Sequence, residues 1–461
     1  MRDDSLDRSK GRHAIVLGGS IGGCLAAEVL SSEFERVTII EKGDFEDGLS
    51  DRRGVPQEKH VHLLLLRGKQ VMEELFPGLL AELVQAGADI ADQGHDVKCF
   101  HYGQWKNRFK TGVSAHYCSR GLLDNVVRRR IRANQRITVH SGTRAMGFLF
   151  RREGAPRVNG VVLDESAPVR ELPAELVIDV NGRGSRVAEW LAKEGLGEVK
   201  KTLVETKLGY ASRLYRRRPE FADRWKVLLV LPRPPHDRAM GVISPIEGNR
   251  WLVTTGGWFG EFPKPEPEEF LRFLGRLPVP DIQEIIRDAE PLSDVAGFAI
   301  PGSLRRHYED MPVWPEGLVV MGDALCSMNP LYSQGMTLCS LEADVLRRQL
   351  PIWKQGGTST RAIQALMAQV VEPAWNMAVS EDMRFPETQG RRSLGLRFHH
   401  WYGSGLCELA ASHRLTLQTQ VGVTNLVVSP SQLFRPEIAA RVVLNKLLPR
   451  LGKTVNDDSP A

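Results

Sequence analysis

An acidic residue follows a short apolar run in the second half of the chain, and a turn and a helical pattern come after it. The apolar run is 317–321, the acid is Asp323, and the turn ends at Gly335. A carboxylate at the carboxyl end of a buried strand can accept hydrogen bonds from a hydroxyl-rich ligand, because ligands of open α/β sheets gather at that edge. A helix that begins at Met336 would direct its first N–H groups toward the same place.

A second candidate ligand site lies near the start of the chain. The apolar run 13–18 is followed by the letters GGSIGG, a helical pattern, and a second apolar run at 37–40 that ends in Glu41. Gly18 would make a tight turn, Gly23 would let the helix lie close to the sheet, and the helix N-terminus would bind a pyrophosphate. Glu41 stands at the spacing expected of a residue that accepts hydrogen bonds from a ribose diol.

This glycine pattern departs from the dinucleotide-binding fingerprint at one position. Ser20 occupies the place of the middle glycine, where a small residue lets phosphate approach the backbone. Serine is the least disruptive substitute, and its hydroxyl adds a hydrogen-bond donor. The pattern predicts a dinucleotide site without deciding between NAD and FAD. The alternative is an ordinary strand–helix turn that is rich in glycine.

Two further segments carry residues that could contact the same ligand. Residues 119–133 read SRGLLDNVVRRRIRA, which predicts a helix with Ser119 as its N-cap and Arg120 in its first turn. The apolar run at 176–180 predicts a buried strand, and the letters NGRGSR follow it.

These blocks resemble the FAD-dependent monooxygenases of the aromatic-hydroxylase type. The resemblance covers four blocks within residues 13–340, and it is closest to the bacterial branch that contains polyether and polyketide epoxidases. It implies that the first block binds the ADP half of FAD, that Arg120 contacts the flavin nucleotide, and that the last block holds the ribityl chain and the flavin ring. Asn181 stands where the family usually has aspartate, so Asp179 is assigned no role. The predicted cofactor-binding residues are Gly18, Ser20, Gly23, Glu41, Arg120, Asp323, Gly335 and Met336.

Composition and charge exclude several other classes of protein. The chain has 461 residues and a net charge of +5, and its arginine clusters at 128–130 and 216–218 are interpreted as solvated faces. A nucleic-acid-binding protein more often has one concentrated basic element, so no nucleic-acid partner is expected. The six cysteines have no metal-ligand spacing, which is typical of reduced thiols in a cytoplasmic protein. No metal site, signal peptide or transmembrane segment is expected.

The predicted fold is α/β, with a Rossmann-like, three-layer FAD-binding domain, an inserted β-sheet substrate domain and a helical C-terminal region. The FAD-binding domain is expected to be discontinuous, because β-rich segments interrupt it. The expected bounds are 12–90, 118–195 and 296–390 for the FAD-binding domain, 91–117 and 196–295 for the substrate domain, and 391–461 for the C-terminal region.

The predicted function is that of an FAD-dependent monooxygenase. It would insert one oxygen atom from dioxygen, by epoxidation or hydroxylation, into a large apolar olefinic or aromatic natural-product intermediate. The cofactor carries the chemistry, so no catalytic side chain is assigned. Only one glycine fingerprint is present, so electrons are expected from NAD(P)H, either directly or through a separate flavin reductase.

Three alternatives remain open. The first is a flavin-dependent halogenase, although its Trp-x-Trp-x-Ile-Pro segment is missing after the fingerprint. The second is an FAD-dependent reductase or dehydrogenase, whose product would form without dioxygen. The third and least favoured is a non-catalytic flavin-binding protein.

The expectation of an apolar substrate also draws on the aromatic residues of the two insertions. Those that face the flavin would form an apolar pocket with few polar anchors, whereas the others would fill the core between sheet and helices. Arg213 is the one evident basic anchor, and strand alternation places it away from Tyr210. The aromatic residues are Phe100, Tyr102, Trp105, Phe109, Tyr210, Tyr215, Trp225, Trp251, Trp258 and Phe259.

Overall fold

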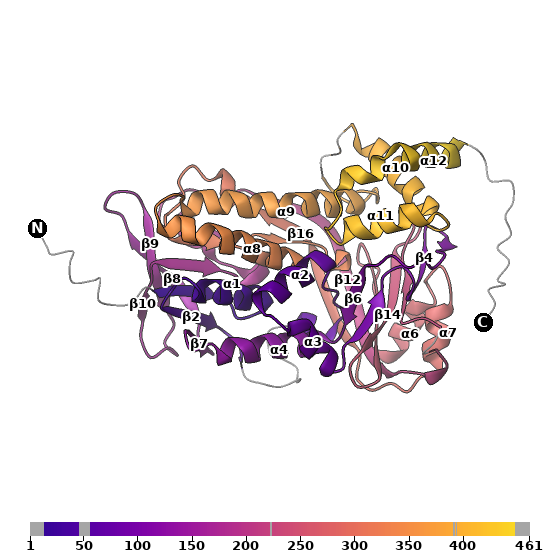
Figure 1. The fold of residues 1–461 in the computed structure, drawn as a ribbon, viewed down its shortest axis with the longest axis horizontal. Helices are drawn as coiled ribbons and strands as arrows, with labels where there is room; N and C mark the ends of the chain where they lie inside the picture. The colour runs from indigo at the N-terminus through magenta and orange to yellow at the C-terminus, as the bar shows by residue number, and fades with distance from the viewer. Residues whose placement is uncertain (1–12, 46–55, 222–223, 391, 393, 448–461) are drawn as a thin grey trace, which may run out of the picture.

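The molecule is elongated, with a parallel sheet and its helices at one end and a large, mostly antiparallel sheet at the other (Figure 1). The computed structural model describes residues 13–45, 56–221, 224–390, 392 and 394–447. Within these ranges, no helix has both the length and the apolar character needed to cross a membrane.

Five short apolar segments form the parallel sheet in the order β17–β11–β1–β2–β7. Their bounds are Leu318–Val320, Leu176–Asp179, His13–Leu17, Arg36–Glu41 and Ile137–Ser141. Ile15 on β1 pairs with Thr38 on one side and with Val177 on the other. The chain leaves β1 toward β2 and later returns to β11 on the opposite side. A topological switch point, where ligands bind in open α/β sheets, therefore lies at the carboxyl end of β1.

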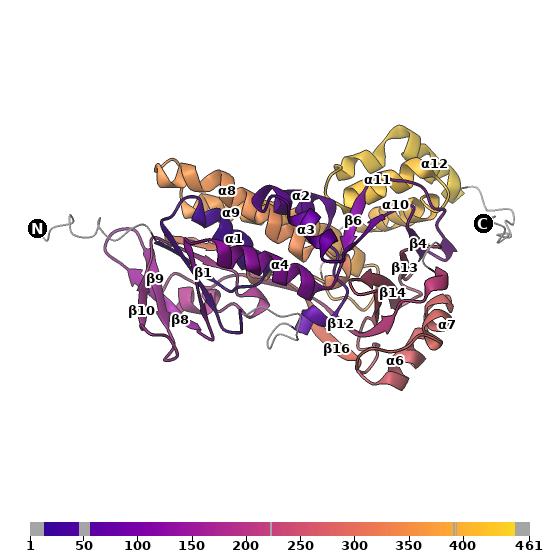
Figure 2. The same cartoon turned by 60° about the horizontal axis from the view of Figure 1, so that its bottom comes forward.

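Helices cover one face of the parallel sheet, and a three-stranded antiparallel sheet covers the other (Figure 2). The main helices are α1 (Ile21–Ser31), α4 (Arg120–Ala133), α8 (Gly335–Lys354) and α9 (Thr360–Asp382). The antiparallel strands are β8 (Ala145–Arg151), β9 (Arg157–Leu163) and β10 (Glu171–Pro173). One hydrophobic core runs through all three layers. The α/β, three-layer prediction is confirmed.

An eight-stranded sheet has the order β18–β16–β12–β15–β14–β13–β4–β5. The bounds in that order are Cys326–Ser327, Ala296–Arg306, Lys201–Arg216, Arg250–Gly257, Ala239–Ile246, Val227–Val230, Val97–His101 and Gln104–Trp105. Neighbouring strands are antiparallel except β13 and β4, which are parallel. Strands from both expected insertions thus join one sheet, and β16 and β18 extend it toward Asp323. The division into domains stays a prediction.

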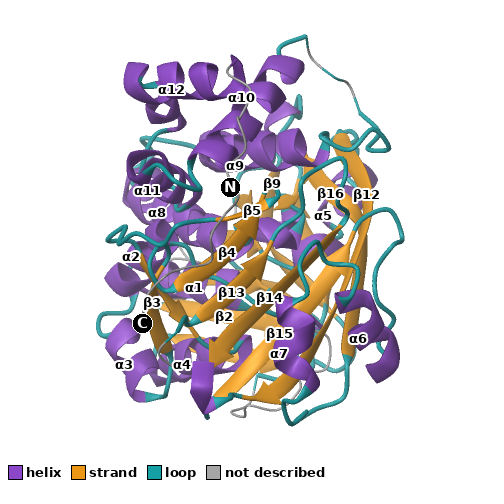
Figure 3. Ribbon diagram, turned by 90° about the vertical axis from the view of Figure 1, so that its right-hand side faces the viewer, coloured by secondary structure: helices purple, strands orange, loops and turns teal. Residues whose placement is uncertain are grey.

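The two faces of the eight-stranded sheet have different partners. Helices α6 (Pro267–Leu274) and α7 (Asp281–Arg287) pack on one face (Figure 3). Aromatic residues of the insertions fill the core on that face, where Trp225 stacks on Trp251 with ring centroids 5.8 Å apart. A cavity lies on the other face. The core-filling alternative holds for Phe100, Tyr215, Trp225 and Trp251, whereas Tyr102, Tyr210 and Trp258 line the cavity.

The C-terminal region is helical, as predicted, up to the last described residues. Its helices are α10 (Leu396–Leu409), α11 (Arg414–Thr424) and α12 (Pro436–Leu447), and residues 448–461 lie outside the described part. The β4–β5 hairpin contacts this region, because Gln104 Nε2 donates to the carbonyl of Glu408 (2.9 Å). The backbone N–H of Asn107 donates to the carbonyl of Ala411 (2.7 Å). The helices therefore cover the open face of the eight-stranded sheet.

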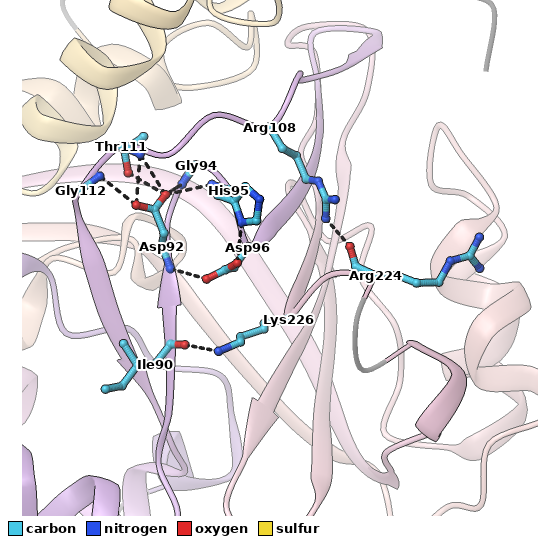
Figure 4. Close-up of polar contacts among 10 residues, drawn as sticks. All are labelled: Ile90, Asp92, Gly94, His95, Asp96, Arg108, Thr111, Gly112, Arg224 and Lys226. Atoms are coloured by element: carbon cyan, nitrogen blue, oxygen red, sulfur yellow. Dashed lines mark hydrogen bonds and ion pairs between the residues drawn. The ribbon is translucent and has the colours of Figure 1, made fainter. Parts of the chain in front are cut away.

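A small two-stranded sheet consists of β3 (Asp89–Asp92) and β6 (Ser114–Tyr117). It lies between the helices of the parallel sheet and the eight-stranded sheet. Figure 4 shows the Asp92 carboxylate at the end of β3 inside a ring of hydrogen-bond donors. The donors are the N–H groups of Gly94, His95, Thr111 and Gly112 and the hydroxyl of Thr111. This network orders the loop that carries Gln93, whose side chain exchanges hydrogen bonds with Asn425 after α11.

Candidate FAD site

The first glycine turn joins β1 to α1, and its backbone has no room for side chains. A methyl group on Gly23 would overlap the carbonyl oxygen of Gly18. Gly18 itself has φ +104°, and a methyl group there would lie 2.6 Å from the carbonyl oxygen of Val180. Both predicted glycine positions therefore require glycine, for the reasons that the sequence pattern indicated.

Glu41 holds the glycine turn from the end of β2. Its Oε2 accepts the N–H of Gly19 (2.6 Å), and its Oε1 accepts the N–H of Gly43 (2.7 Å). The first turn of α1 contains no acidic residue, so the positive end of its dipole is not neutralised from within the helix. The turn thus presents a helix N-terminus and a carboxylate side by side, which suits a pyrophosphate next to a ribose.

Ser20 and Arg120 are in contact, although a hundred residues separate them in the chain. Arg120 Nη2 donates to Ser20 Oγ (3.1 Å), and its Nε donates to Asp124 Oδ1 (2.5 Å). Ser119 accepts the N–H of Leu122, as expected of the N-cap of α4. The structure therefore brings the predicted arginine to the glycine turn and fixes its guanidinium there.

Arg128 lies beside the same turn and was not predicted as a site residue. Its guanidinium carbon lies 4.5 Å from the ring centroid of Phe45, and its Nη2 approaches the carbonyl of Gly19 (3.5 Å). Only 3% of Arg128 is exposed, so the interpretation of the 128–130 cluster as a solvated face is wrong for this residue. A sequence signal existed, because Arg120, Asp124 and Arg128 recur every four residues on one face of α4.

Asp323 follows β17 at the carboxyl edge of the parallel sheet. Within the described ranges, no group donates a hydrogen bond to its carboxylate. A methyl group on Gly335 would lie 3.8 Å from Oδ1, so the structure brings these two predicted residues together. Burial raises the pKa of Asp323, and the nearby guanidinium groups of Arg120, Arg183 and Arg306 oppose that rise. This carboxylate is placed to accept hydrogen bonds from a ligand.

Glu342 lies behind Asp323 and is a second residue that sequence reasoning missed. Its Oε2 accepts the N–H of Gly322 (2.8 Å), whereas its buried Oε1 has no partner among the described residues. Burial, and then the charge of Asp323, raise the pKa of Glu342 to about 8. The signal was an acid on the inward face of the helical pattern after Met336, where a charge is costly unless it has a role.

The N-terminus of α8 carries the last predicted residues. The helix begins at Gly335, one residue before the predicted start, and Gln334 is its N-cap. Gln334 is 2% exposed, and neither its Oε1 nor its Nε2 has a hydrogen-bond partner in the described part of the chain. Met336 is half-buried against the core. A buried amide without partners is rare, so Gln334 is a candidate to form hydrogen bonds with a ligand.

Helix α8 brings the first and last motifs together. A methyl group on Gly22 and one on Gly322 would each lie 3.1 Å from Sγ of Cys339 on α8. Asp179 lies between these turns, but its carboxylate accepts hydrogen bonds from Asn181 and Ser185. Burial raises the pKa of Asp179 to about 6. The hydrogen bonds of Asp179 thus hold the segment 181–185 at the edge of the site.

A cavity of about 1250 Å³ adjoins the N-terminus of α8. It lies between the open face of the eight-stranded sheet, helices α9 to α11 and the segment 330–334. Arg213, the basic anchor considered from the sequence, is not part of its wall and donates to the carbonyl of Ser293 (2.8 Å). Most of the wall is apolar, including Leu229, Met240 and Trp258. A large apolar molecule would fit beside the predicted flavin site.

Comparison with known proteins finds one related sequence with substantial identity. No protein-family model matches the chain. The protein Rv3254 of Mycobacterium tuberculosis (strain ATCC 25618 / H37Rv) is 32% identical over 388 residues, which are 81% of this chain and 80% of Rv3254.

Solved structures share the fold at lower identity. PqsL, a probable FAD-dependent monooxygenase from Pseudomonas aeruginosa, has a TM-score of 0.61 and 19% identity, with 89% of this chain and 99% of PqsL covered. The flavin-dependent brominase Bmp2 has a TM-score of 0.66 and 14% identity, with 94% of this chain and 99% of Bmp2 covered. The chain therefore belongs to the family of Rv3254, and its fold is that of the FAD-binding monooxygenases.

Proposed function

We propose that the chain is an FAD-dependent monooxygenase that inserts one oxygen atom from dioxygen into a large, mostly apolar substrate. One observation carries this proposal. The segment 330–334 leads from Asp323 into α8, where the flavin is expected, and the same segment lines the cavity. One turn of the chain would therefore contact the cofactor on one side and the substrate on the other.

Residues at the carboxyl edge of the parallel sheet fit FAD. The pyrophosphate would bind at the glycine turn and the start of α1, where Ser20 and Arg120 lie beside it. Glu41 would bind the ribose.

The remaining half of the cofactor would lie at the last motif. Asp323 would accept hydrogen bonds from the ribityl hydroxyls, because no group in the described chain occupies its carboxylate. The first N–H groups of α8, at Gly335 and Met336, would face the pyrimidine edge of the flavin. Bound FAD, once reduced, supplies the electrons that activate dioxygen. The apolar cavity wall would exclude water from the reaction.

The finer substrate assignment is an olefinic or aromatic natural-product intermediate that becomes an epoxide or a hydroxylated product. The apolar cavity supports the size and character of the substrate. The resemblance to polyether and polyketide epoxidases supports the reaction. Electrons would come from NAD(P)H, either directly or from a separate flavin reductase.

Halogenation is a second candidate, favoured by the shared fold with the brominase Bmp2. The missing Trp-x-Trp-x-Ile-Pro segment counts against it. An FAD-dependent reductase or dehydrogenase would share the cofactor site but would not consume dioxygen. A non-catalytic flavin-binding role leaves the large cavity without a purpose.

The test is a screen of olefinic and aromatic compounds with FAD-loaded protein under ¹⁸O-labelled dioxygen. NADH, NADPH and a separate flavin reductase are supplied in parallel, with and without bromide or chloride. A one-oxygen mass gain that carries the label supports monooxygenation, and the parallel supplies identify the electron source. A product with a halogen isotope pattern would replace the proposal with halogenation. A product formed equally without dioxygen would replace it with a reductase or dehydrogenase.

A further inference from the structure

The hairpin between β4 and β5 turns on two residues with positive φ. Tyr102 has φ +52° and Gly103 has φ +78°. A two-residue turn of this kind favours asparagine, aspartate and glycine, because a larger side chain is strained in the left-handed region. A tyrosine at the first turn position is therefore unfavourable for the hairpin itself. Strained residues of this kind cluster at sites that bind ligands.

The Tyr102 side chain points into the cavity rather than into solvent. It lines the cavity wall and is 8% exposed. Its Oη is buried, and nothing in the described chain forms a hydrogen bond with it. The neighbouring His101 also lines the cavity, and its buried Nδ1 lacks a partner among the same residues. The two rings meet edge to face with centroids 4.8 Å apart.

An ion pair between Arg384 and Glu381 lies beside these two side chains. The guanidinium of Arg384 lies 5.9 Å from the Tyr102 ring, but its Nε donates to Glu381 (2.7 Å). Burial raises the pKa of Tyr102, so the phenol keeps its proton at neutral pH. Burial, and then the positive charges of Lys106 and Arg384, lower the pKa of His101, so the imidazole is neutral. Two neutral polar side chains thus lie together in a mostly apolar wall.

We propose that Tyr102 is a specificity-determining residue whose Oη donates a hydrogen bond to a carbonyl-type oxygen of the substrate, with His101 beside it. The substrate is then an apolar skeleton that carries a neutral oxygen acceptor, not a pure hydrocarbon. This inference rests on the proposed function in one respect, because it takes the cavity as the substrate site. It explains why a strained tyrosine stands at the turn, since a turn-forming asparagine or glycine would not reach the ligand.

A matched pair of probes tests the inference without knowledge of the natural substrate. Fluorene and 9-fluorenone have the same ring skeleton and differ by one carbonyl oxygen. Both are titrated against the full-length, FAD-loaded protein, with the change in flavin absorbance as the signal. The wild type is expected to bind 9-fluorenone about 10-fold more tightly than fluorene, the size of one net hydrogen bond. In Tyr102→Phe the two affinities become equal, and that of fluorene is unchanged.

Tyr402→Phe is the control, because Tyr402 also lines the cavity but its hydroxyl donates to the carbonyl of Leu433 (2.6 Å). This variant keeps the preference for 9-fluorenone and has a lower melting temperature, since it loses a hydrogen bond within the chain. Tyr102→Phe is expected to melt no lower than the wild type, because its hydroxyl has no partner in the described chain to lose. A merely structural Tyr102 would give the reverse pattern.

An unchanged preference for 9-fluorenone in Tyr102→Phe would overturn the inference. This outcome is distinguishable from failure of the proposed function, which is read from labelled dioxygen in the product. If Tyr102→Phe abolishes the preference while no labelled product forms in any screen, the oxygen anchor stands and monooxygenation is rejected. If labelled product forms and the preference is unchanged, only the anchor is rejected.

Discussion

Asp92 and Asp323 both lie where a strand ends, but their surroundings are opposite. Four backbone N–H groups and one hydroxyl donate to the Asp92 carboxylate. In the described part of the chain, no group donates to the carboxylate of Asp323. The first carboxylate completes its hydrogen bonds within the fold, whereas the second does not, and we propose that a ligand supplies its donors. For this pair of acids, the hydrogen-bond partners within the fold separate a structural residue from a candidate binding residue.

The pKa of Asp92 is lowered, whereas the pKa of Asp323 is raised. Burial raises the pKa of Asp92, but hydrogen bonds from His95, Thr111 and Gly94 outweigh it and lower the pKa overall. Burial also raises the pKa of Asp323, and the charges of the nearby arginines, which donate no hydrogen bond to its carboxylate, do not cancel the rise. Donors that contact the carboxylate therefore decide the direction of the shift.

The largest expected effect is on cofactor binding at Asp323, the acid without a donor in the described chain. Asp323→Ala should weaken FAD binding about 10- to 100-fold, because a hydrogen bond to a charged group contributes roughly 1.5–3 kcal/mol. Titration of the apoprotein with FAD, followed by flavin fluorescence, measures the dissociation constant. Asp92→Ala is the control and should bind FAD as the wild type does. Equal affinity of Asp323→Ala and wild type would show that Asp323 does not contact the ribityl chain.

The next effect reverses the roles of the two acids. Asp92→Ala should lower the free energy of unfolding by about 2 kcal/mol, because several donors lose their acceptor at once. Asp323→Ala should leave the stability of the FAD-free protein unchanged or slightly higher. Urea denaturation of both variants measures this difference. The exposed Asp288, which has arginine partners only at 3.9 Å, supplies a control in which Asp288→Ala changes little. A stable Asp92→Ala would contradict the structural role.

A smaller effect is the pH dependence of stability, which should have opposite signs at the two acids. The lowered pKa of Asp92 gives stability that is present above the ordinary value of 3.8 and is lost as the pH falls through the folded-state value. The raised pKa of Asp323 gives a penalty above its folded-state value, and that penalty is relieved as the pH falls toward 3.8. When the pH is lowered from neutral to below 3.8, Asp92→Asn should therefore lose less stability than the FAD-free wild type. Asp323→Asn should lose more stability than the FAD-free wild type over the same interval. Slopes of the same sign would refute the assignment of one acid.

The smallest expected effect is at the departure from the glycine fingerprint. Ser20→Gly removes a hydroxyl that accepts one hydrogen bond from Arg120 but makes no capping hydrogen bond to α1. Glycine in place of serine at an N-cap costs only about 0.3 kcal/mol. FAD affinity should change by less than about 3-fold, as measured by the same titration. A loss as large as that of Asp323→Ala would mean that the Ser20 hydroxyl contacts the cofactor itself.

Much of the α/β fold could be predicted because its signals are local. Each of the apolar runs at 13–18, 37–40 and 176–180 could be recognised from its own few residues and the turn after it. All three form strands of the parallel sheet. Ser119 could be assigned as an N-cap because capping depends on neighbouring residues. The aromatic residues of the insertions could not be divided in the same way, since the two faces of the eight-stranded sheet are both covered.

The sequence by itself determined the strand–glycine turn–helix–strand–acid order and the acid at the end of β17, because backbone geometry and periodicity encode these over a few residues. The tertiary structure decided which polar groups are buried and whether they have partners. Arg128, Glu342 and Gln334 became candidate site residues only when α4 and α8 packed beside the glycine turns. Tyr102 became one only when the C-terminal helices covered its hairpin. Burial and hydrogen-bond completion depend on contacts between distant segments, and those contacts exist only in the folded chain.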